Sequence, residues 1–163
     1  MSGDEAGSTE DLFRLALSSS EAGEQVSDDE TARVLRRAGR ASSALQGARL
    51  LWVAPNHWKN KELRSTIESL GVSVSTTDTS AKALAMLRDG QYDVILSSDY
   101  REGHHEGAPF AQKLVGRGYR QPLIFWVSVV ELDLRSEPNV LGVTNRPHEL
   151  LHYLIDALER VRG

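Results

Sequence analysis

Hydrophobic residues in this sequence gather in five short runs that are separated by longer amphipathic stretches. Three of the runs are almost wholly apolar: Leu50–Val53, Val94–Leu96 and Leu123–Val127. Continuous apolar runs of this length are typical of strands that are covered on both faces. The pattern predicts strands at 49–54, 72–76, 93–98, 122–127 and 140–143.

The stretches between these runs carry apolar residues at intervals of three and four, which is typical of helices with one buried face. Leu63, Ile67 and Leu70 show the interval after the first run, and Gly71 follows as a helix terminator. The same spacing predicts three later helices, at Ala81, Leu84, Ala85 and Leu87, at Phe110, Leu114 and Val115, and at Leu150, Leu151, Leu154, Ile155 and Leu158. A further helix around 131–136 is expected to be short. This alternation predicts an α/β fold, in which a parallel sheet carries helices on both faces.

The first part of the chain differs from the rest in composition. Residues 1–29 are rich in Ser, Gly, Asp and Glu, and we expect most of this acidic segment to be disordered. The exception is Asp11–Leu17, where Leu12 and Phe13 begin a short apolar cluster. Two interpretations stay open: a frayed helix that rests on the domain, or an amphipathic motif that docks in the groove of a partner.

A better specified N-terminal helix is predicted at 30–46. Ser27 and Glu30 fit a capping box, in which two side chains satisfy the free amides of the first turn. An apolar face and a neighbouring cationic face follow, formed by Val34, Ala38, Ala41 and Leu45 and by Arg33, Arg36, Arg37 and Arg40. Such arginines could meet anionic lipid or nucleic acid, but a cationic helix face is more often simply solvated. We expect this helix to pack on the following domain, 47–163, or to self-associate.

Charge and cysteine content exclude several classes of function. Residues 1–47 carry 9 acidic residues and 5 Arg, which gives −4, whereas 48–163 carry 14 acidic and 14 basic residues, which gives 0. A domain without a cationic excess is a poor candidate for direct nucleic-acid binding. The absence of cysteine excludes disulfides, thiolate zinc sites and cysteine nucleophiles. No apolar run approaches the roughly 18 residues of a membrane span, so a cytoplasmic location is expected.

Six segments between residues 48 and 161 carry a recognisable order of motifs. They are Arg49-Leu50-Leu51-Trp52-Val53, Glu68-Ser69-Leu70-Gly71, Ser80-Ala81-Lys82-Ala83-Leu84, Tyr92-Asp93-Val94-Ile95-Leu96-Ser97, Gln121-Pro122-Leu123-Ile124-Phe125 and Thr144-Asn145-Arg146-Pro147. In this order and spacing they resemble the receiver (CheY-like) domain of bacterial response regulators. The resemblance implies a flavodoxin-like, doubly wound five-stranded parallel sheet and a role in signal transduction, as in two-component systems.

The resemblance also implies where a phosphorylation site would lie, at the carboxyl ends of the strands. The acidic pair that holds magnesium in receivers falls on Ala54 and Pro55, and only the next residue, Asn56, matches. A hard divalent cation needs clustered oxygen ligands, which these residues do not supply. Without that cation a transferring phosphoryl group loses its main charge neutralisation. The sequence therefore predicts a degenerate receiver, or pseudo-receiver, without cofactor or metal.

The remaining receiver positions are changed as well. The phosphoacceptor aspartate falls on Ser98, the hydroxyl residue on Val127, and the lysine before proline on Arg146. Asp99 lies one residue beyond the acceptor position and is the fallback acceptor, although a one-residue shift turns a side chain to the opposite face of a strand. The resemblance also implies a cis bond between Arg146 and Pro147.

One short pattern suggests different chemistry. His148, Glu149 and His152 match the H-E-x-x-H pattern of zinc peptidases, in which two histidines bind the metal and the glutamate activates water. His104 and His105 could add a ligand, which makes a zinc-dependent hydrolase an alternative function. We favour the simpler interpretation that all four histidines are surface residues of a loop and a helix.

These observations together predict a regulatory module that acts through protein contacts without phosphorylation, and no enzyme. Expected partners are other proteins or a second copy; direct binding of nucleic acid, membrane or a small-molecule substrate is not expected. In receivers the face of the fourth helix, fifth strand and fifth helix carries signalling contacts. That resemblance, together with exposed apolar residues elsewhere, gives these candidates for the partner surface: Leu12, Phe13, Trp58, Leu132, Leu134, Val140 and His148. Trp58 could equally cap the space left by the missing acidic pair.

Overall fold

The computed structural model describes residues 28–55, 60–130 and 132–163, and the statements below concern these residues. Its centre is a five-stranded parallel sheet with the strand order β2-β1-β3-β6-β7. The strands are β1 (Arg49–Val53), β2 (Ser73–Thr77), β3 (Val94–Ser97), β6 (Leu123–Trp126) and β7 (Val140–Thr144). The strand order reverses between β1 and β3, as in doubly wound sheets. The predicted fold class is therefore confirmed.

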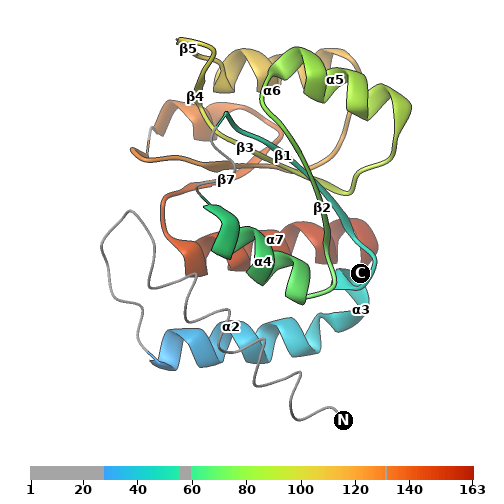
Figure 1. Cartoon of the computed structure of the whole chain (residues 1–163), viewed down its shortest axis with the longest axis vertical. Coiled ribbons are helices and arrows are strands. Elements are labelled where there is room, and N and C mark those ends of the chain that lie inside the picture. Colours follow the sequence, from blue (N-terminus) through green and yellow to red (C-terminus); the bar gives the residue numbers. More distant parts are fainter. Residues whose placement is uncertain (1–27, 56–59, 131) are drawn as a thin grey trace.

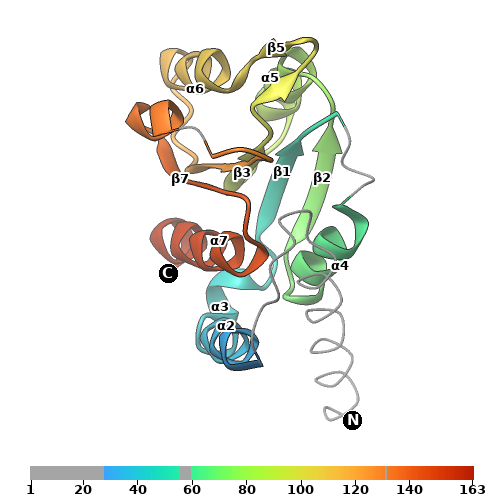
Figure 2. The same cartoon turned by 90° about the vertical axis from the view of Figure 1, so that its left-hand side faces the viewer.

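Helices cover both faces of the sheet (Figure 1). α5 (Ser80–Asp89) and α6 (Gly107–Gly116) lie on one face, and α4 (Lys61–Ser69) and α7 (Pro147–Arg162) lie on the other. A view turned by 90° shows the same separation (Figure 2). The short helix expected around 131–136 is the 3-10 turn η2 (Leu132–Ser136). In the described parts of the chain, no helix combines the length and apolarity that a membrane crossing requires.

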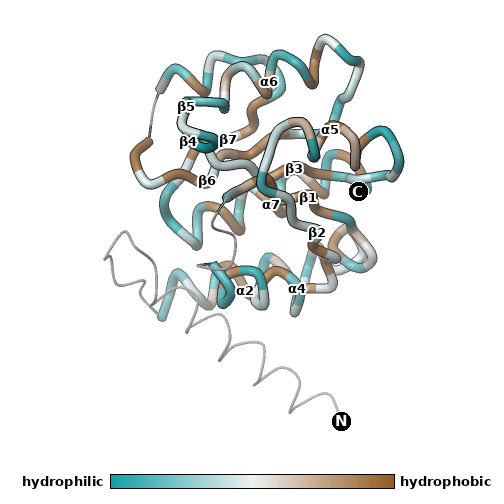
Figure 3. The backbone as a smooth tube through the Cα atoms, turned by 45° about the horizontal axis from the view of Figure 1, so that its top comes forward, coloured by the Kyte–Doolittle hydropathy of each residue, from teal (hydrophilic) through white to brown (hydrophobic). Residues whose placement is uncertain are grey.

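Apolar side chains fill the space between the sheet and both helix layers. Because successive strand residues point to opposite faces, Trp52 packs with the α4 and α7 side, whereas Leu51 and Val53 pack with the α5 and α6 side. All three are completely buried. Figure 3 shows the hydrophobic colour concentrated on the strands between the helix layers. The apolar runs are thus strands covered on both faces, as predicted.

A further helix, α2 (Asp28–Arg40), lies outside the layer formed by α4 and α7 (Figures 1 and 2). Its buried face consists of Thr31, Val34 and Ala38, and the last two belong to the same apolar cluster as the side chains of α7. Ala41 then separates α2 from a single helical turn, α3 (Ser42–Leu45). The N-terminal helix thus packs on the domain, which is one of the two arrangements that the sequence left open.

The spacing of apolar residues located α5 and α6 correctly but misplaced two of their side chains. Ala81 is exposed on α5, and Val115 is 47% exposed on α6. The buried positions are instead Ala83 on α5 and Ala111 on α6, which are small enough to approach the sheet closely. Small residues give a weak periodic signal, so the sequence pattern assigned the helices but not the full width of their buried faces.

Candidate functional site

The carboxyl edge of the sheet brings together three of the positions that the sequence singled out. Each follows a strand and continues its hydrogen-bonding pattern by one residue: Ala54 N donates to Thr77 O (2.9 Å), Ser98 N to Val53 O (2.9 Å) and Val127 N to Thr144 O (3.1 Å). Arg146 and Pro147 follow β7 at the same edge and begin α7. The topology therefore assembles the predicted site from residues far apart in the sequence.

This edge has little negative charge. Ala54 is buried, Pro55 is exposed and Val127 is half-buried, so none of them supplies an oxygen ligand from its side chain. Ser98 Oγ is buried and has no hydrogen-bond partner among the described residues. Over the same residues, no group of three or more His, Cys, Asp or Glu side chains is placed to hold a metal ion. The part of this edge that the structure describes therefore offers no cluster of oxygen ligands for magnesium, and Asn56 lies outside that part.

A buried arginine lies directly beside the acceptor position. Arg101 belongs to β4 (Tyr100–Arg101), which forms a small antiparallel hairpin with β5 (His104–His105) after β3. Its side chain is completely buried, and its guanidinium donates to Ser97 Oγ (2.8 Å), Ser98 O (2.5 Å) and Ser80 Oγ (2.6 Å). The guanidinium carbon also lies 4.9 Å from the ring centre of Phe110, a cation–π distance.

Burial lowers the pKa of Arg101, because desolvation disfavours the charged form, while Glu102, Glu106 and Asp99 act in the opposite direction. An arginine pKa starts so high that the group remains a cation at neutral pH. At an effective dielectric constant of 20, a divalent cation about 8 Å away would be repelled by roughly 4 kcal/mol. A single buried cation thus lies beside the acceptor position, where a receiver concentrates negative charge.

Sequence reasoning did not identify Arg101. A single sequence assigns arginine to the surface by default, because arginine is rarely fully buried. The partners of Arg101 come from three segments, and Ser80 is 21 residues away along the chain. The only hint was the run of small hydroxyl residues Ser97 and Ser98 just before it.

Asp99, the fallback acceptor, is held away from this site. Its Oδ2 lies 2.8 Å from His105 Nδ1, and its Oδ1 accepts a hydrogen bond from Gly107 N (3.1 Å). The carboxylate therefore satisfies an amide at the start of α6, where the helix dipole favours negative charge. A Cβ on Gly107 would meet Asp99 Oδ1 at 2.6 Å, so this close approach requires glycine. The geometry gives Asp99 a structural role, with both carboxylate oxygens already engaged.

The last receiver position also departs from expectation. The described residues contain no cis peptide bond, so the predicted cis bond between Arg146 and Pro147 is wrong. Arg146 N donates to Thr144 Oγ1 (3.0 Å), and Pro147 occupies the first turn of α7, where its missing amide hydrogen has no cost. The trans bond before Pro147 is a further difference between this chain and the receiver pattern that the segment Thr144-Asn145-Arg146-Pro147 resembles.

The H-E-x-x-H pattern lies on α7, and its two histidines contact residues of α2. His152 Nδ1 lies 3.0 Å from Arg37 Nη1, and Arg37 also forms ion pairs with Asp156 and Glu159. His148 Nε2 lies 4.0 Å from a carboxylate oxygen of Glu30. Burial, Arg37 and His148 lower the pKa of His152. A guanidinium beside the ring opposes a bound cation, so the structure does not support the zinc-hydrolase alternative.

The predicted partner surface needs correction at one residue. Leu134 is 4% exposed and packs in the core with the α5 and α6 side chains, so it cannot contact a partner. Val140 is half-buried against the same cluster, and His148 is half-buried beside α2. The remaining candidates, Leu12, Phe13 and Trp58 and the side chain of Leu132, lie outside the described residues. Two exposed apolar side chains that the sequence did not single out are Tyr100 (59%) and Val129 (69%).

Comparison with known proteins agrees with the architecture. No family model matches the chain, and no curated protein matches its sequence. Among solved structures, the receiver domain of an HD domain-containing protein from Pseudomonas fluorescens is 17% identical with a TM-score of 0.60, over 69% of this chain and 95% of that one. The response regulator TrrA from Thermotoga maritima, solved with magnesium and BeF, is 16% identical with a TM-score of 0.57, over 68% and 98%. A receiver protein from Sinorhizobium medicae is 18% identical with a TM-score of 0.59, over 73% and 99%.

The chain has the fold of a response-regulator receiver domain. Each of these structures matches over nearly its whole length but covers about 70% of this chain, which is longer than a receiver domain alone. Identities below 20% establish the shared fold and leave the chemistry to be argued from the residues. The receiver fold is present here with a different set of side chains at its carboxyl edge.

Proposed function

We propose that this chain is a receiver-like regulatory module that acts through protein–protein contacts and does not accept a phosphoryl group. The observation that carries the proposal is the buried guanidinium of Arg101, which donates to the backbone carbonyl of the acceptor position, Ser98. A phosphoryl group and its magnesium ion need a concentration of negative charge to assemble. Here the carboxylate of the next residue, Asp99, instead accepts a hydrogen bond from Gly107 N at the start of α6.

The same edge offers a contact surface in place of a phosphorylation site. Tyr100 on β4 and Val129 in the loop after β6 are both exposed, and they follow neighbouring strands of the sheet. Exposed aromatic and apolar side chains are common anchors of protein contacts. Leu134 is excluded by its burial, and the outer side of α7 is partly covered by α2. We therefore place the partner contact at Tyr100 and Val129, and no catalytic activity, cofactor or small-molecule substrate is required.

Incubation of the full chain with acetyl phosphate and magnesium, followed by intact-mass measurement, tests the proposal. We expect no added phosphoryl group and no saturable magnesium binding by calorimetry. A single phosphoryl group that is lost on Asp99→Asn would overturn the proposal and establish the fallback acceptor instead. Stoichiometric zinc in the purified protein, lost on His152→Ala, would favour the hydrolase alternative.

A restored variant provides the matched control. Ala54→Asp, Pro55→Asp and Ser98→Asp together return the carboxylates that receivers carry. If the charge of Arg101 opposes the metal, this variant should bind magnesium much more weakly than the same variant with Arg101→Met added. With roughly 4 kcal/mol of repulsion removed, the gain in affinity should be on the order of 10² to 10³. Equal affinity of the two variants would show that the buried cation is irrelevant to the site.

A further inference from the structure

The start of α5 has a backbone amide that no carbonyl of the helix satisfies. Thr79 caps this helix, since its Oγ1 accepts a hydrogen bond from Lys82 N (3.1 Å). The amide of Ser80, the first helical residue, has no partner within the helix. It donates instead to Oε2 of Glu102, at 3.4 Å. A typical N–H···O bond is shorter, at about 2.9–3.0 Å. The carboxylate of Glu102 therefore satisfies this amide only weakly.

The guanidinium of Arg101 converges on the same oxygen. Its Nε lies 3.9 Å from Glu102 Oε2, which is an ion-pair distance but too long for a hydrogen bond. This Nε is buried and has no hydrogen-bond partner among the described residues. The other two nitrogens already donate to Ser80 Oγ, Ser97 Oγ and Ser98 O. A completely buried charged group thus has one donor without an acceptor, and that donor is directed at the point where Oε2 lies.

Two donors that meet at one point select an acceptor with negative charge. The start of a helix favours anions, because its free amides and its dipole are positive there. The buried guanidinium adds a full positive charge at the same place. A well-placed oxyanion would approach both nitrogens to about 2.7–2.9 Å, whereas Glu102 Oε2 stays at 3.4 and 3.9 Å. The arrangement is that of an oxyanion site which its own carboxylate fills loosely.

Glutamate is an uncommon residue for the place that Glu102 takes in the hairpin. Glu102 and Gly103 form the two-residue turn between Arg101 and His104, with φ values of 56° and 80°. The first position of such a turn prefers Asn, Asp or Gly, because its backbone is left-handed. The turn therefore does not account for glutamate, whereas the reach of its side chain to the start of α5 does. This side chain is 38% exposed, so rotation into solvent would open the space in front of both donors.

We propose that the start of α5 and Arg101 form a binding site for a small oxyanion, a carboxylate or a phosphate group, and that Glu102 fills this site when no ligand is bound. Ser80 N and Arg101 Nε hold the ligand, and the side chain of Glu102 turns outward as it enters. Binding is noncovalent, so the site is compatible with the proposed absence of phosphorylation. Either idea can fail without the other, because inorganic phosphate, the probe used below, is not a phosphoryl donor.

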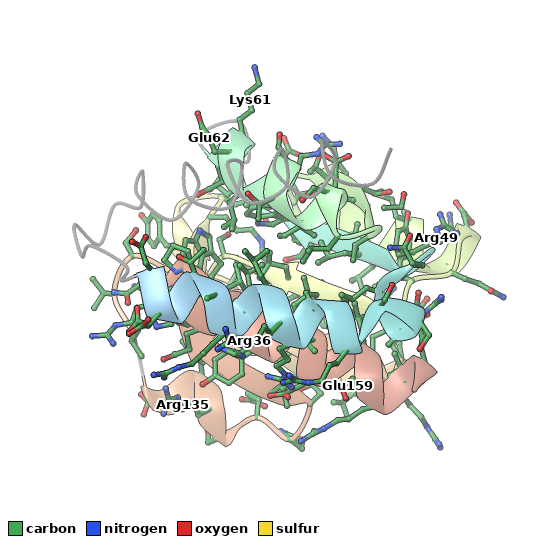
Figure 4. All side chains as sticks on the ribbon, turned by 90° about the horizontal axis from the view of Figure 1, so that it is seen from below. Arg36, Arg49, Lys61, Glu62, Arg135 and Glu159 are labelled. Atoms are coloured by element: carbon green, nitrogen blue, oxygen red, sulfur yellow. The ribbon has the colours of Figure 1, made fainter. Side chains whose placement is uncertain are left out.

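Titration of the full-length ¹⁵N-labelled protein with sodium phosphate or sodium acetate, at constant ionic strength, tests the site. The Nε–H signal of Arg101 and the amide signal of Ala81 should shift and saturate. The ion that saturates them at the lower concentration identifies the group that the site prefers. The amides of α2 are the internal control, because Arg36 is exposed on the outer side of that helix, across the sheet from α5 (Figures 1 and 4). Shifts of equal size at α2 and at Ala81 would mean nonspecific attraction of anions and would overturn the proposal.

Removal of the built-in carboxylate should strengthen binding. Glu102→Gln keeps the shape of the side chain and loses its charge, and Glu102→Gly removes the side chain while suiting the left-handed turn. A tethered carboxylate competes at an effective concentration in the millimolar range, so both variants should lower the dissociation constant of phosphate roughly tenfold. The matched control, Asp89→Asn, removes one exposed negative charge at the other end of α5 and should leave the constant unchanged. If neither Glu102 variant binds phosphate more tightly than the wild type, the proposal is wrong.

A pair of variants at Ser80 isolates the contribution of the amide. Ser80→Ala and Ser80→Pro both remove the hydroxyl group that Arg101 contacts, but only proline also removes the amide hydrogen. Proline suits the first position of a helix, and Thr79 already has the extended backbone that a residue before proline needs. In the Glu102→Gln background, Ser80→Pro should weaken phosphate binding about tenfold or more relative to Ser80→Ala, as expected for a hydrogen bond to a charged acceptor. Unchanged amide signals of the sheet would show that both variants fold, and equal affinities would then refute the site.

Discussion

Arg101 is the residue whose replacement should reveal most about this fold. Its side chain is completely buried, and it donates to the hydroxyl groups of Ser80 and Ser97 and to the carbonyl of Ser98. These contacts connect the start of α5, the end of β3 and the β4–β5 hairpin. Truncation to alanine removes all three hydrogen bonds and leaves a space beside Phe110.

The expected cost follows from these contacts. Three hydrogen bonds at about 1 kcal/mol net each contribute about 3 kcal/mol. The volume vacated by the side-chain stem adds about 1 kcal/mol. Arg101→Ala should therefore lower the free energy of unfolding by about 4 kcal/mol, out of a typical 5–15 kcal/mol. Glu102 is not included, because its carboxylate is 38% exposed and 3.9 Å from Nε.

Urea unfolding monitored by tryptophan fluorescence measures this loss. With a slope of about 2 kcal/mol per molar urea, the midpoint should fall by about 2 M. A shift corresponding to less than about 1 kcal/mol would refute the view that Arg101 anchors the edge of the sheet. Arg36→Ala, which removes an exposed arginine, is the control and should change the midpoint very little.

A second set of variants separates the hydrogen bonds from the buried charge. Arg101→Met keeps most of the volume and removes a charge that is costly to bury, but it leaves the hydroxyl groups of Ser80 and Ser97 without their donor. Ser97 Oγ still donates to Ser98 O (2.8 Å), so the group left without a partner is Ser80 Oγ. Adding Ser80→Ala removes it, so the double variant should be more stable than Arg101→Met alone. Replacement of a buried charged group together with its partners is often neutral or stabilising. If the double variant is less stable than Arg101→Met, the hydrogen-bond argument is wrong.

Three further predictions concern other parts of the molecule. Arg37→Ala should increase amide hydrogen exchange throughout α2 without unfolding the sheet, because it removes the ion pairs to α7. The pKa of His152 is lowered in the docked state, so the undocked state binds a proton more readily. Docking of α2 should therefore be complete above about pH 6.5 and should weaken as the pH falls through the lower pKa of the docked state. Hydrogen exchange of the α2 amides, measured as a function of pH, can follow this change. Asp99→Ala should cost about 1 kcal/mol in urea unfolding by removing the acceptor at the start of α6. Gly142→Ala should cost more, because a Cβ there would meet the ring of Tyr153 at 2.5 Å; an unchanged midpoint would contradict this.

Many of the strands and helices could be predicted from local sequence patterns. The apolar runs of β1, β3 and β6 are visible in the sequence because these strands are buried on both faces, and the structure places each within one or two residues of its predicted ends. The helix α2 was visible for a similar reason, since Val34 and Ala38 recur at helical spacing. Val115 was assigned to a buried face and is exposed, because adjacent apolar residues on a helix point in different directions.

The sequence by itself determined the order of strands and helices and the absence of acidic residues at Ala54, Pro55 and Ser98. Both follow from residue type and spacing, which need no knowledge of distant contacts. The tertiary structure decided which side chains fill the edge instead. It turned Asp99 toward α6, buried Arg101 against Ser80, and joined the histidines of α7 to Arg37. These outcomes depend on contacts between segments 8 to 115 residues apart, and desolvation acts on a charge only after such contacts have closed around it.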